Sequence, residues 1–140
     1  MSSSDPSQSF ELPEDWFDLD VPHDVDLDKP GIYIWEIEGA GKYVGKYTRI
    51  ERPTKQYGRN VRRIFSGRPY HDKSKPDGFR HIHRELAKAH REGRKIILHI
   101  PENVPNPEAR HAREGELIAE CGNLNRSGDR PSDLEPGKME

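Results

Sequence analysis

Hydrophobic residues in the first half of the chain gather in two short runs that predict a β-hairpin. Residues 32–37 mix isoleucines and aromatic residues with Glu36, and residues 43–44 form a second apolar pair. This mixing is typical of a half-exposed strand. Gly39 and Gly41 lie between the runs and allow the chain to reverse. A β-branched run at residues 95–100 predicts a third strand, which we expect to pair with the hairpin because three strands are more stable than two.

Three further segments have the apolar spacing of helices. The first follows Pro53 and ends at Gly67, the second ends near Gly93, and the third covers residues 108–121. Their apolar stripes consist of Tyr57, Val61, Ile64 and Phe65, then Phe79, Ile82, Leu86 and Ala89, and then Leu117, Ile118 and Cys121. The pattern therefore predicts an α+β fold, a small three-stranded antiparallel sheet flanked by about three helices.

Composition favours one small domain with polar ends. The chain has 140 residues, of which 31% are hydrophobic, and a mean hydropathy of -1.06. We predict an acidic leader at residues 1–28 that is disordered or loosely docked, a folded domain at 29–128 and a polar tail at 129–140. The sequence lacks a run of ~20 apolar residues and an apolar N-terminal signal. We expect a cytoplasmic protein without a membrane partner.

The net charge of -2 conceals an uneven distribution. Residues 1–29 hold nine acidic residues and one lysine, whereas residues 30–128 hold 20 Lys and Arg against 12 Asp and Glu. A basic domain is consistent with a polyanionic partner. The acidic leader either keeps the protein soluble or lies over the basic surface and competes with nucleic acid, and the sequence leaves both alternatives open.

Two charged features stand out on the predicted helices. Arg59, Arg62 and Arg63 share the face opposite the apolar stripe of the first helix, without a nearby acid, so they form either a solvated face or a phosphate contact. Glu114 falls within the apolar stripe of the last helix. A buried carboxylate is costly unless it is paired or holds a metal, so Glu114 either pairs with Arg110 or binds a cation.

The hairpin begins with Gly31-Ile32-Tyr33 and ends with Tyr43-Val44-Gly45. These triplets resemble those of the GIY-YIG endonuclease family, in which they end two antiparallel strands. The later order of arginine helix, second helix, strand, glutamate helix and Leu-Asn pair matches that domain across about residues 28–128. The resemblance implies a three-stranded antiparallel sheet with flanking helices, and a hydrolase that cuts a DNA phosphodiester with one divalent metal ion.

The resemblance also implies roles for residues at matching positions. Tyr33 and Tyr43 match the two motif tyrosines, Tyr33 to orient or deprotonate the attacking water and Tyr43 to hydrogen-bond the phosphate. Glu114 matches the metal-binding glutamate and would hold Mg²⁺ or Mn²⁺. Asn125 matches a late asparagine that supports the glutamate or the waters of the metal.

Two more positions match residue types found in many or some members. Lys46 directly follows the second triplet and is expected to contact nucleic acid. His81 matches a histidine at the start of the second helix. We prefer His81 to His83 as the site residue, because the helical period places His83 closer to the apolar face. A surface histidine without a role remains the alternative.

The catalytic arginine is the least certain match. In the family it usually follows the second triplet by about eight residues, whereas Arg59 is fourteen residues past Gly45. We interpret the loop that carries Arg49 and Arg52 as an insertion. Arg59 is then the first candidate, and Arg63 and Arg62 follow.

Together these features predict a metal-dependent DNA endonuclease that contacts the phosphate backbone. Two other functions stay open, namely a nucleic-acid-binding module that has lost cleavage and a protein-interaction domain whose arginine face binds an acidic partner. The DNA target and the pathway are not determined by the sequence. Specificity could come from DNA structure, from residues 68–78, from a homodimer or from a separate partner.

Overall fold

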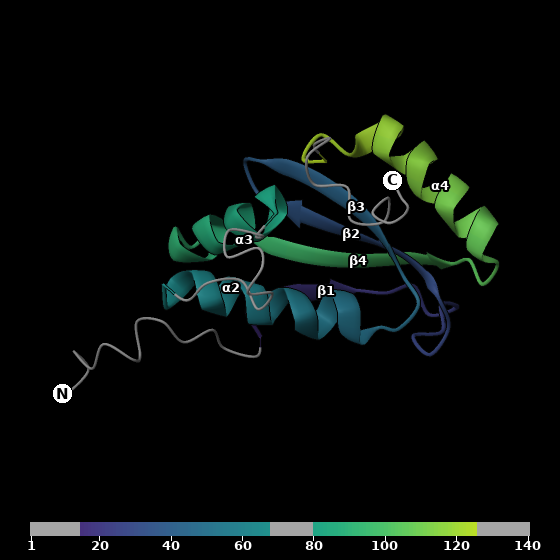
Figure 1. Ribbon diagram of the computed structural model, residues 1–140, viewed down its shortest axis with the longest axis horizontal. Helices are drawn as coiled ribbons and strands as arrows, with labels where there is room; N and C mark the ends of the chain where they lie inside the picture. Colours follow the sequence, from purple (N-terminus) through teal and green to yellow (C-terminus); the bar gives the residue numbers. More distant parts are fainter. Residues whose placement is uncertain (1–14, 68–79, 126–140) are drawn as a thin grey trace, which may run out of the picture.

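The computed structural model describes residues 15–67 and 80–125 and contains four strands and three α-helices (Figure 1). The strands are β1 (Asp18–Asp20), β2 (Gly31–Ile37), β3 (Gly41–Tyr47) and β4 (Ile96–Asn103). A short π-helix, η1 (Arg52–Gln56), leads directly into α2 (Tyr57–Phe65), and α3 (His81–Arg91) and α4 (Pro107–Cys121) follow. The class is α+β, as predicted.

The sheet has four strands in the order β1-β4-β2-β3, so the prediction of three strands was wrong. β2 is antiparallel to both β3 and β4, which confirms that the third run pairs with the hairpin. β1 runs parallel to β4 and makes the sheet mixed. This strand was missed because it is only three residues long and two of them are aspartates, a residue type depleted in strands.

The segment before β2 is therefore more ordered than the leader that the sequence predicts. Trp16 is buried and stacks on Trp35 of β2 with 5.3 Å between ring centroids, and Phe17 meets the same ring edge-on at 5.1 Å. Leu19, on β1, stays exposed. Docking of residues 15–28 thus combines a stacked tryptophan pair with a short parallel strand, while residues 1–14 lie outside the described part of the chain.

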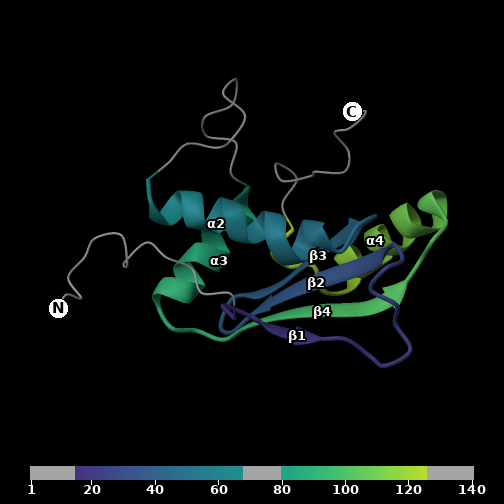
Figure 2. The ribbon, with the colours of Figure 1, turned by 90° about the horizontal axis from the view of Figure 1, so that it is seen from below.

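Helices pack on both faces of the sheet, and in the view from below α2 lies above the strands while α4 runs behind them (Figure 2). Successive side chains of β2 point to opposite faces of the sheet and so belong to two different layers of the core. Tyr33 and Trp35 belong to the larger core cluster with residues of α2 and α3, whereas Ile32 packs with Val44 and with Leu117 of α4. The sheet thus has one tyrosine-rich face under α2 and α3 and one aliphatic face under α4.

The free edge of β3 is closed by the segment that follows α4. Asn123 accepts a hydrogen bond from the backbone N–H of Lys42 and donates one to the carbonyl of Ala40. The backbone N–H of Leu124 donates to the carbonyl of Lys42 at 2.9 Å. These contacts satisfy backbone groups that an edge strand otherwise leaves open, and they anchor the end of α4 to the hairpin.

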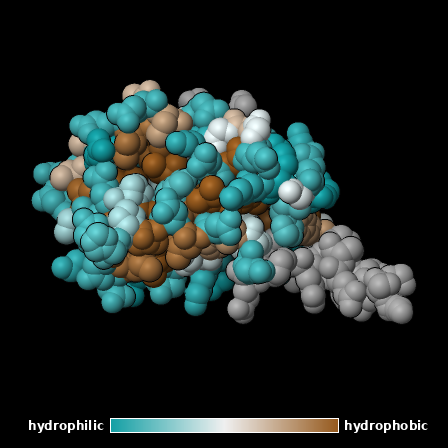
Figure 3. All heavy atoms as spheres, turned by 180° about the vertical axis from the view of Figure 1, so that it is seen from behind, coloured by the Kyte–Doolittle hydropathy of each residue, from teal (hydrophilic) through white to brown (hydrophobic). Residues whose placement is uncertain are grey.

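The side opposite the view of Figure 1 shows apolar atoms near its middle with polar residues around them (Figure 3). Among the described residues, Leu19 is the one large hydrophobic residue that is exposed, so partly covered side chains account for most of this apolar area. No helix within residues 15–67 and 80–125 has both the length and the apolar character needed to cross a membrane.

Candidate functional site

The two triplet glycines are required by close contacts around the hairpin. Tyr33 lies opposite Gly45, and its ring crosses directly over that residue. A Cβ at Gly45 would lie 2.2 Å from Cζ of Tyr33, and a Cβ at Gly31 would lie 2.3 Å from the carbonyl oxygen of Glu102. Both distances are far below van der Waals contact, so the two glycines let the strands and the Tyr33 ring pack together.

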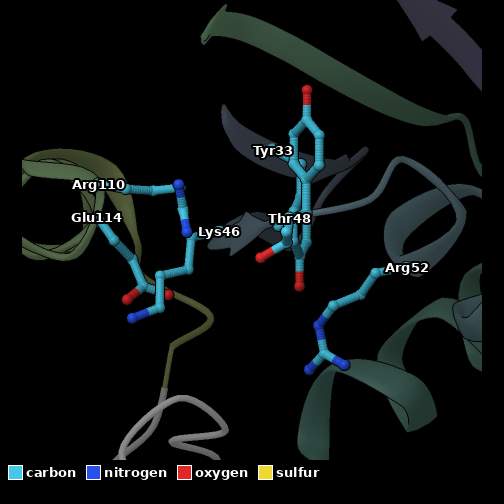
Figure 4. Close-up of a pocket in the computed structure, with 7 residues that line it drawn as sticks. Tyr33, Lys46, Thr48, Arg52, Arg110 and Glu114 are labelled. Atoms are coloured by element: carbon cyan, nitrogen blue, oxygen red, sulfur yellow. The ribbon is translucent and has the colours of Figure 1, made fainter. Parts of the chain in front are cut away.

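A pocket of about 270 Å³ opens at the end of the hairpin, between η1 and α4 (Figure 4). Its lining comes from four elements and the loop after β3, and consists of Tyr33, Lys46, Tyr47, Thr48, Arg52, Arg110 and Glu114. Three of these side chains are cationic and one is a carboxylate. The pocket therefore combines an excess of positive charge with a single acidic group, an arrangement suited to an anionic ligand and a cation together.

Glu114 is the buried carboxylate of this pocket and is 4% exposed. It lies on α4, whose N-terminus is capped by the Asn106 side chain accepting from the backbone N–H of Ala109. His111, one turn earlier, places its Nδ1 3.8 Å from Oε1 of Glu114 and 2.9 Å from Nζ of Lys46. The prediction of a carboxylate inside the apolar stripe is confirmed, because Glu114 is buried on the same helix as Leu117.

Arg110 has hydrogen-bond partners besides any contact with Glu114. Its Nη1 donates to the carbonyls of Val104 and Pro105 at 3.0 Å each. These bonds hold Arg110 against the turn that precedes α4 and leave its charge at the wall of the pocket. The residue was considered in the sequence only as a partner for Glu114, whereas in the fold it also lines the pocket.

Behind the pocket lies a group that we call the tyrosine cluster: Tyr33, Tyr43, Tyr57, Arg80 and His83. The hydroxyls of Tyr33 and Tyr57 are 2.6 Å apart. Arg80, directly before α3, donates from Nη1 to Tyr43 at 3.0 Å and from Nη2 to Tyr57 at 3.2 Å. Of the two motif tyrosines, Tyr33 lines the pocket, and Tyr43 lies within the cluster and outside the lining.

Burial raises the pKa of both motif tyrosines well above the ordinary value of a phenol. For Tyr33, neighbouring Tyr57 and Tyr43 raise the pKa further, while Arg52 and Arg80 act in the opposite direction. Both hydroxyls are therefore protonated near neutral pH. They can donate and accept hydrogen bonds there, but they are not free tyrosinate bases.

His83, rather than His81, belongs to the tyrosine cluster. Its ring meets Tyr57 at 5.1 Å, and its Nδ1 accepts from the backbone N–H of Arg80 at 3.0 Å. Burial lowers the pKa of His83 well below its ordinary value, and the positive charge of Arg80 lowers it further. His81 is partly exposed and lies 3.7 Å from Glu85. The helical period correctly placed His83 on the buried side of the helix. That side faces the tyrosine cluster, so His83 and not His81 lies beside the candidate site residues.

Of the arginines that follow the second triplet, Arg52 lines the pocket, whereas Arg59 and Arg62 are exposed on α2 and, like Arg63, are absent from the pocket lining. Arg52 is seven residues past Gly45, near the spacing of the family arginine, and that spacing was the available signal. The segment interpreted as an insertion contains η1. A π-turn adds a residue to the helical turn and often marks a functional site; here it lies between Arg52 at the pocket and Tyr57 in the cluster.

Asn125 uses its side-chain amide on the hairpin backbone. Its Oδ1 accepts from the N–H of Val44 and its Nδ2 donates to the carbonyl of Val44, both at 2.9 Å. Val44 lies between the second motif tyrosine and Gly45, so this paired contact ties the end of α4 to the triplet itself. Asn125 thereby holds the helix of Glu114 in position against β3.

The donors at the pocket fit a hydrated Mg²⁺ or Mn²⁺ ion. Within residues 15–67 and 80–125, no three His, Cys, Asp or Glu side chains gather to form a metal site, and Glu114 is the carboxylate at the pocket. Mg²⁺ usually keeps several waters and binds through one or two carboxylates together with substrate phosphates. The nearby cationic side chains oppose binding of a bare cation, so we expect the metal to bind tightly only with a phosphate present.

Comparisons with known protein families, with curated proteins and with solved structures found no match for this chain. The residues of the pocket and of the tyrosine cluster therefore carry the evidence for a function. Three residues of these groups had no sequence signal of their own. Tyr57 was read as an apolar stripe residue, and Arg80 and Thr48 follow no motif.

Proposed function

We propose that this protein is a metal-dependent DNA endonuclease of the GIY-YIG type that hydrolyses phosphodiester bonds. The observation that carries the proposal is one pocket that contains Tyr33, Lys46, Arg52 and Glu114, although these residues are far apart in the sequence. They supply a hydroxyl, two cations and a carboxylate at one place. That combination matches the needs of an anionic electrophile attacked by water.

The cationic side chains have the first task in this reaction. A phosphodiester is a poor electrophile because its negative charge repels the nucleophile, so charge must be neutralised before attack. Arg52 binds the non-bridging oxygens, since a guanidinium can donate two parallel hydrogen bonds to a phosphate. Lys46 adds a second positive charge on β3, and its link to His111 at 2.9 Å holds the ammonium near Glu114.

Glu114 is the residue that would hold the divalent metal, supported by Asn125 through the end of α4. When bound, such an ion stabilises the charge that develops on the leaving oxygen. Burial helps this role because a buried carboxylate gains more from an adjacent cation than an exposed one does. Glu114 thus has a functional reason for its costly position in the apolar stripe.

Tyr33 orients the attacking water as a protonated hydroxyl. Its raised pKa argues against a free tyrosinate at neutral pH, so the water loses its proton to solvent or to a phosphate oxygen. Tyr43 acts behind Tyr33, and its hydroxyl is held by Arg80. In this scheme Arg59, Arg62 and Arg63 contact neighbouring phosphates along α2 and contribute to binding more than to the chemical step.

The test is cleavage of supercoiled plasmid with Mg²⁺ or Mn²⁺. Glu114→Gln should lower the cleavage rate by about 100-fold or more because the metal site loses its charge, while Glu120→Gln, on the exposed face of the same helix, should cut normally. Arg52→Met should lower kcat about 100-fold, as loss of a charge-stabilising donor does. Arg59→Met should change mainly the affinity for DNA and its salt dependence.

Each alternative has its own result in this experiment. Equal loss of kcat in Arg59→Met and Arg52→Met would contradict the assignment of Arg52. Salt-sensitive DNA binding without cleavage by the wild type or any variant would favour a binding module. Absence of DNA binding at low salt would favour a protein-interaction domain.

A further inference from the structure

We propose that Arg80 is a positioning residue that sets the direction of the hydrogen bond between Tyr57 and Tyr33, so that Tyr33 turns its own proton toward the pocket. This inference rests on the proposed nuclease function for its consequence in catalysis. Its structural part concerns only the tyrosine cluster. It can therefore be tested even if the protein cuts no DNA.

The guanidinium of Arg80 donates one hydrogen bond to each of two tyrosine hydroxyls. Nη1 donates to the hydroxyl of Tyr43 at 3.0 Å and Nη2 to the hydroxyl of Tyr57 at 3.2 Å. The guanidinium also lies 5.4 Å from the centroid of the Tyr57 ring. A lysine cannot reproduce this arrangement, because its single ammonium lacks the planar pair of donors.

The partners of this guanidinium are unusual for an arginine. Among the described residues its side-chain hydrogen bonds go to Tyr43 and Tyr57, its Nη2 lies 3.5 Å from Nε2 of His83, and none of these partners is a carboxylate. A partly buried cation without an acidic partner is costly. Arg80 is thus poorly explained as a structural ion pair, whereas a role in orienting hydroxyls accounts for the choice of phenol partners.

The direction of the next hydrogen bond follows from charge. The oxygen of Tyr57 accepts a hydrogen bond from a cation, which makes its own O–H a stronger donor. The Tyr33 oxygen lies 2.6 Å away, whereas the hydroxyl of Tyr43, the other phenol beside Tyr57, already accepts from Nη1 of Arg80. With Tyr57 donating, Tyr33 accepts on its cluster side and has its proton available for an oxygen in the pocket, either that of the phosphate or that of the attacking water.

Without Arg80, the bond between the two tyrosines can reverse. Tyr33 would then donate to Tyr57 and lose its donor toward the pocket. His83 cannot replace the positive charge of Arg80, because burial keeps the pKa of its ring well below the ordinary value and the ring stays neutral near pH 7. Tyr43 is likewise held by Arg80 rather than by Tyr33.

The experiment uses the full chain in four forms: wild type, Arg80→Met, Arg80→Lys and Lys88→Met. Lys88 is exposed on the same helix, so its variant controls for loss of one positive charge. We expect Arg80→Met to lower kcat about tenfold or more with KM changed less than about threefold. The kcat of Arg80→Lys should be close to that of Arg80→Met, because lysine restores the positive charge but not the planar pair of donors. Lys88→Met should keep the wild-type kcat.

A spectroscopic measurement separates positioning from a merely structural role. The proteins are labelled with ¹³C at the ζ carbon of tyrosine, and the Tyr33 resonance is assigned with Tyr33→Phe. We expect this resonance to move in Arg80→Met and in Tyr57→Phe, but not in Lys88→Met. An unchanged Tyr33 resonance in folded Arg80→Met would overturn the proposal.

The outcomes also distinguish this inference from the proposed function. If the wild type cuts no DNA but the Tyr33 resonance moves in Arg80→Met, the role of Arg80 in directing the hydrogen bond is retained and the nuclease function is rejected. If Arg80→Met keeps the wild-type kcat, the hydrogen bond that Arg80 directs has no role in catalysis, and the proposed nuclease function still stands. If Arg80→Met does not fold, Tyr57→Phe tests the same hydrogen bond, and an unchanged Tyr33 resonance in that variant would overturn the proposal.

Discussion

Two polar clusters on the same sheet each hold a basic side chain between two oxygen-bearing ones. In the tyrosine cluster, Arg80 bridges the hydroxyls of Tyr43 and Tyr57. On the other face, His99 of β4 places its Nδ1 2.7 Å from Asp20 and its Nε2 2.7 Å from Glu36. We call this second group, Asp20, Glu36 and His99, the carboxylate–histidine cluster. It ties β1 to the central strands.

The two clusters differ mainly in their access to water. The side chains of Asp20 and Glu36 are 63% and 39% exposed, whereas Tyr43 and Tyr57 are fully buried. Water can replace a broken bond in the exposed cluster and salt can screen it. In the buried cluster a lost partner leaves a polar group unsatisfied. The contacts of His99 are shorter than the hydrogen bonds of Arg80, but they do not therefore contribute more to stability.

The largest effect should come from a methyl group placed beneath Tyr33. Gly45→Ala should lower the free energy of unfolding by about 3 kcal/mol, because the new Cβ overlaps a ring that is held by Tyr57. Gly115→Ala is the matched control on α4, where no atom lies within 4 Å of the added Cβ. It should raise stability by about 0.5–1 kcal/mol through helix propensity. Urea unfolding checks both values, and a mild effect of Gly45→Ala would mean that the cluster is loosely packed.

Removal of single groups should then separate the two clusters. Tyr57→Phe should lower the free energy of unfolding by about 2 kcal/mol, since Tyr33 and Arg80 both lose a buried partner. His99→Ala should cost only about 0.5 kcal/mol, and this cost should shrink in high salt. Tyr47→Phe is the control, because the buried Tyr47 hydroxyl has no hydrogen-bond partner among the described residues; it should be near neutral. If Tyr57→Phe and His99→Ala lower the free energy of unfolding by similar amounts, burial does not make the tyrosine cluster the more important of the two for stability.

The stability of the buried cluster should also depend on pH, because this cluster contains a buried histidine. The pKa of His83 is lowered in the folded protein, while an unfolded histidine has a pKa of about 6.5. The unfolded state therefore binds more protons as the pH falls below about 6.5, and stability falls by at most about 1.4 kcal/mol per pH unit until the folded-state pKa is reached. His83→Gln should flatten this slope in unfolding measurements, and His23→Gln, at an exposed position, should leave it unchanged. An equal slope in both variants would place His83 in contact with water.

Local patterns in the sequence predicted most of the regular structure. The hairpin, the strand at residues 95–100 and three helices were recovered because apolar spacing and glycine positions are local signals. Gly67 and Gly93, expected to end two helices, have positive φ of 71° and 72°. β1 was missed because a short aspartate-containing strand depends on the free edge of β4 and not on its own composition.

The site was predicted less completely than the fold. Tyr33, Lys46 and Glu114 were identified from motif positions and line the pocket, whereas Arg59, Arg62 and Arg63 are absent from its lining. Helical periodicity shows which residues share one face, but it does not show which end of a helix approaches another element. η1 brings Arg52 to the pocket at the start of this helical segment, and the arginines of α2 follow about two to three turns later.

The sequence by itself determined three of the four strands, the three α-helices and the buried place of Glu114, because each depends on neighbours within a few residues. Only the tertiary structure decided that Arg52, Arg110 and Glu114 share a pocket and that Arg80 meets Tyr43 and Tyr57. Arg52 is separated from the other two pocket residues, and Arg80 from its two tyrosines, by tens of residues along the chain. Contacts of this kind follow from how α2, α3 and α4 pack on the sheet, and no periodicity within one segment records that packing.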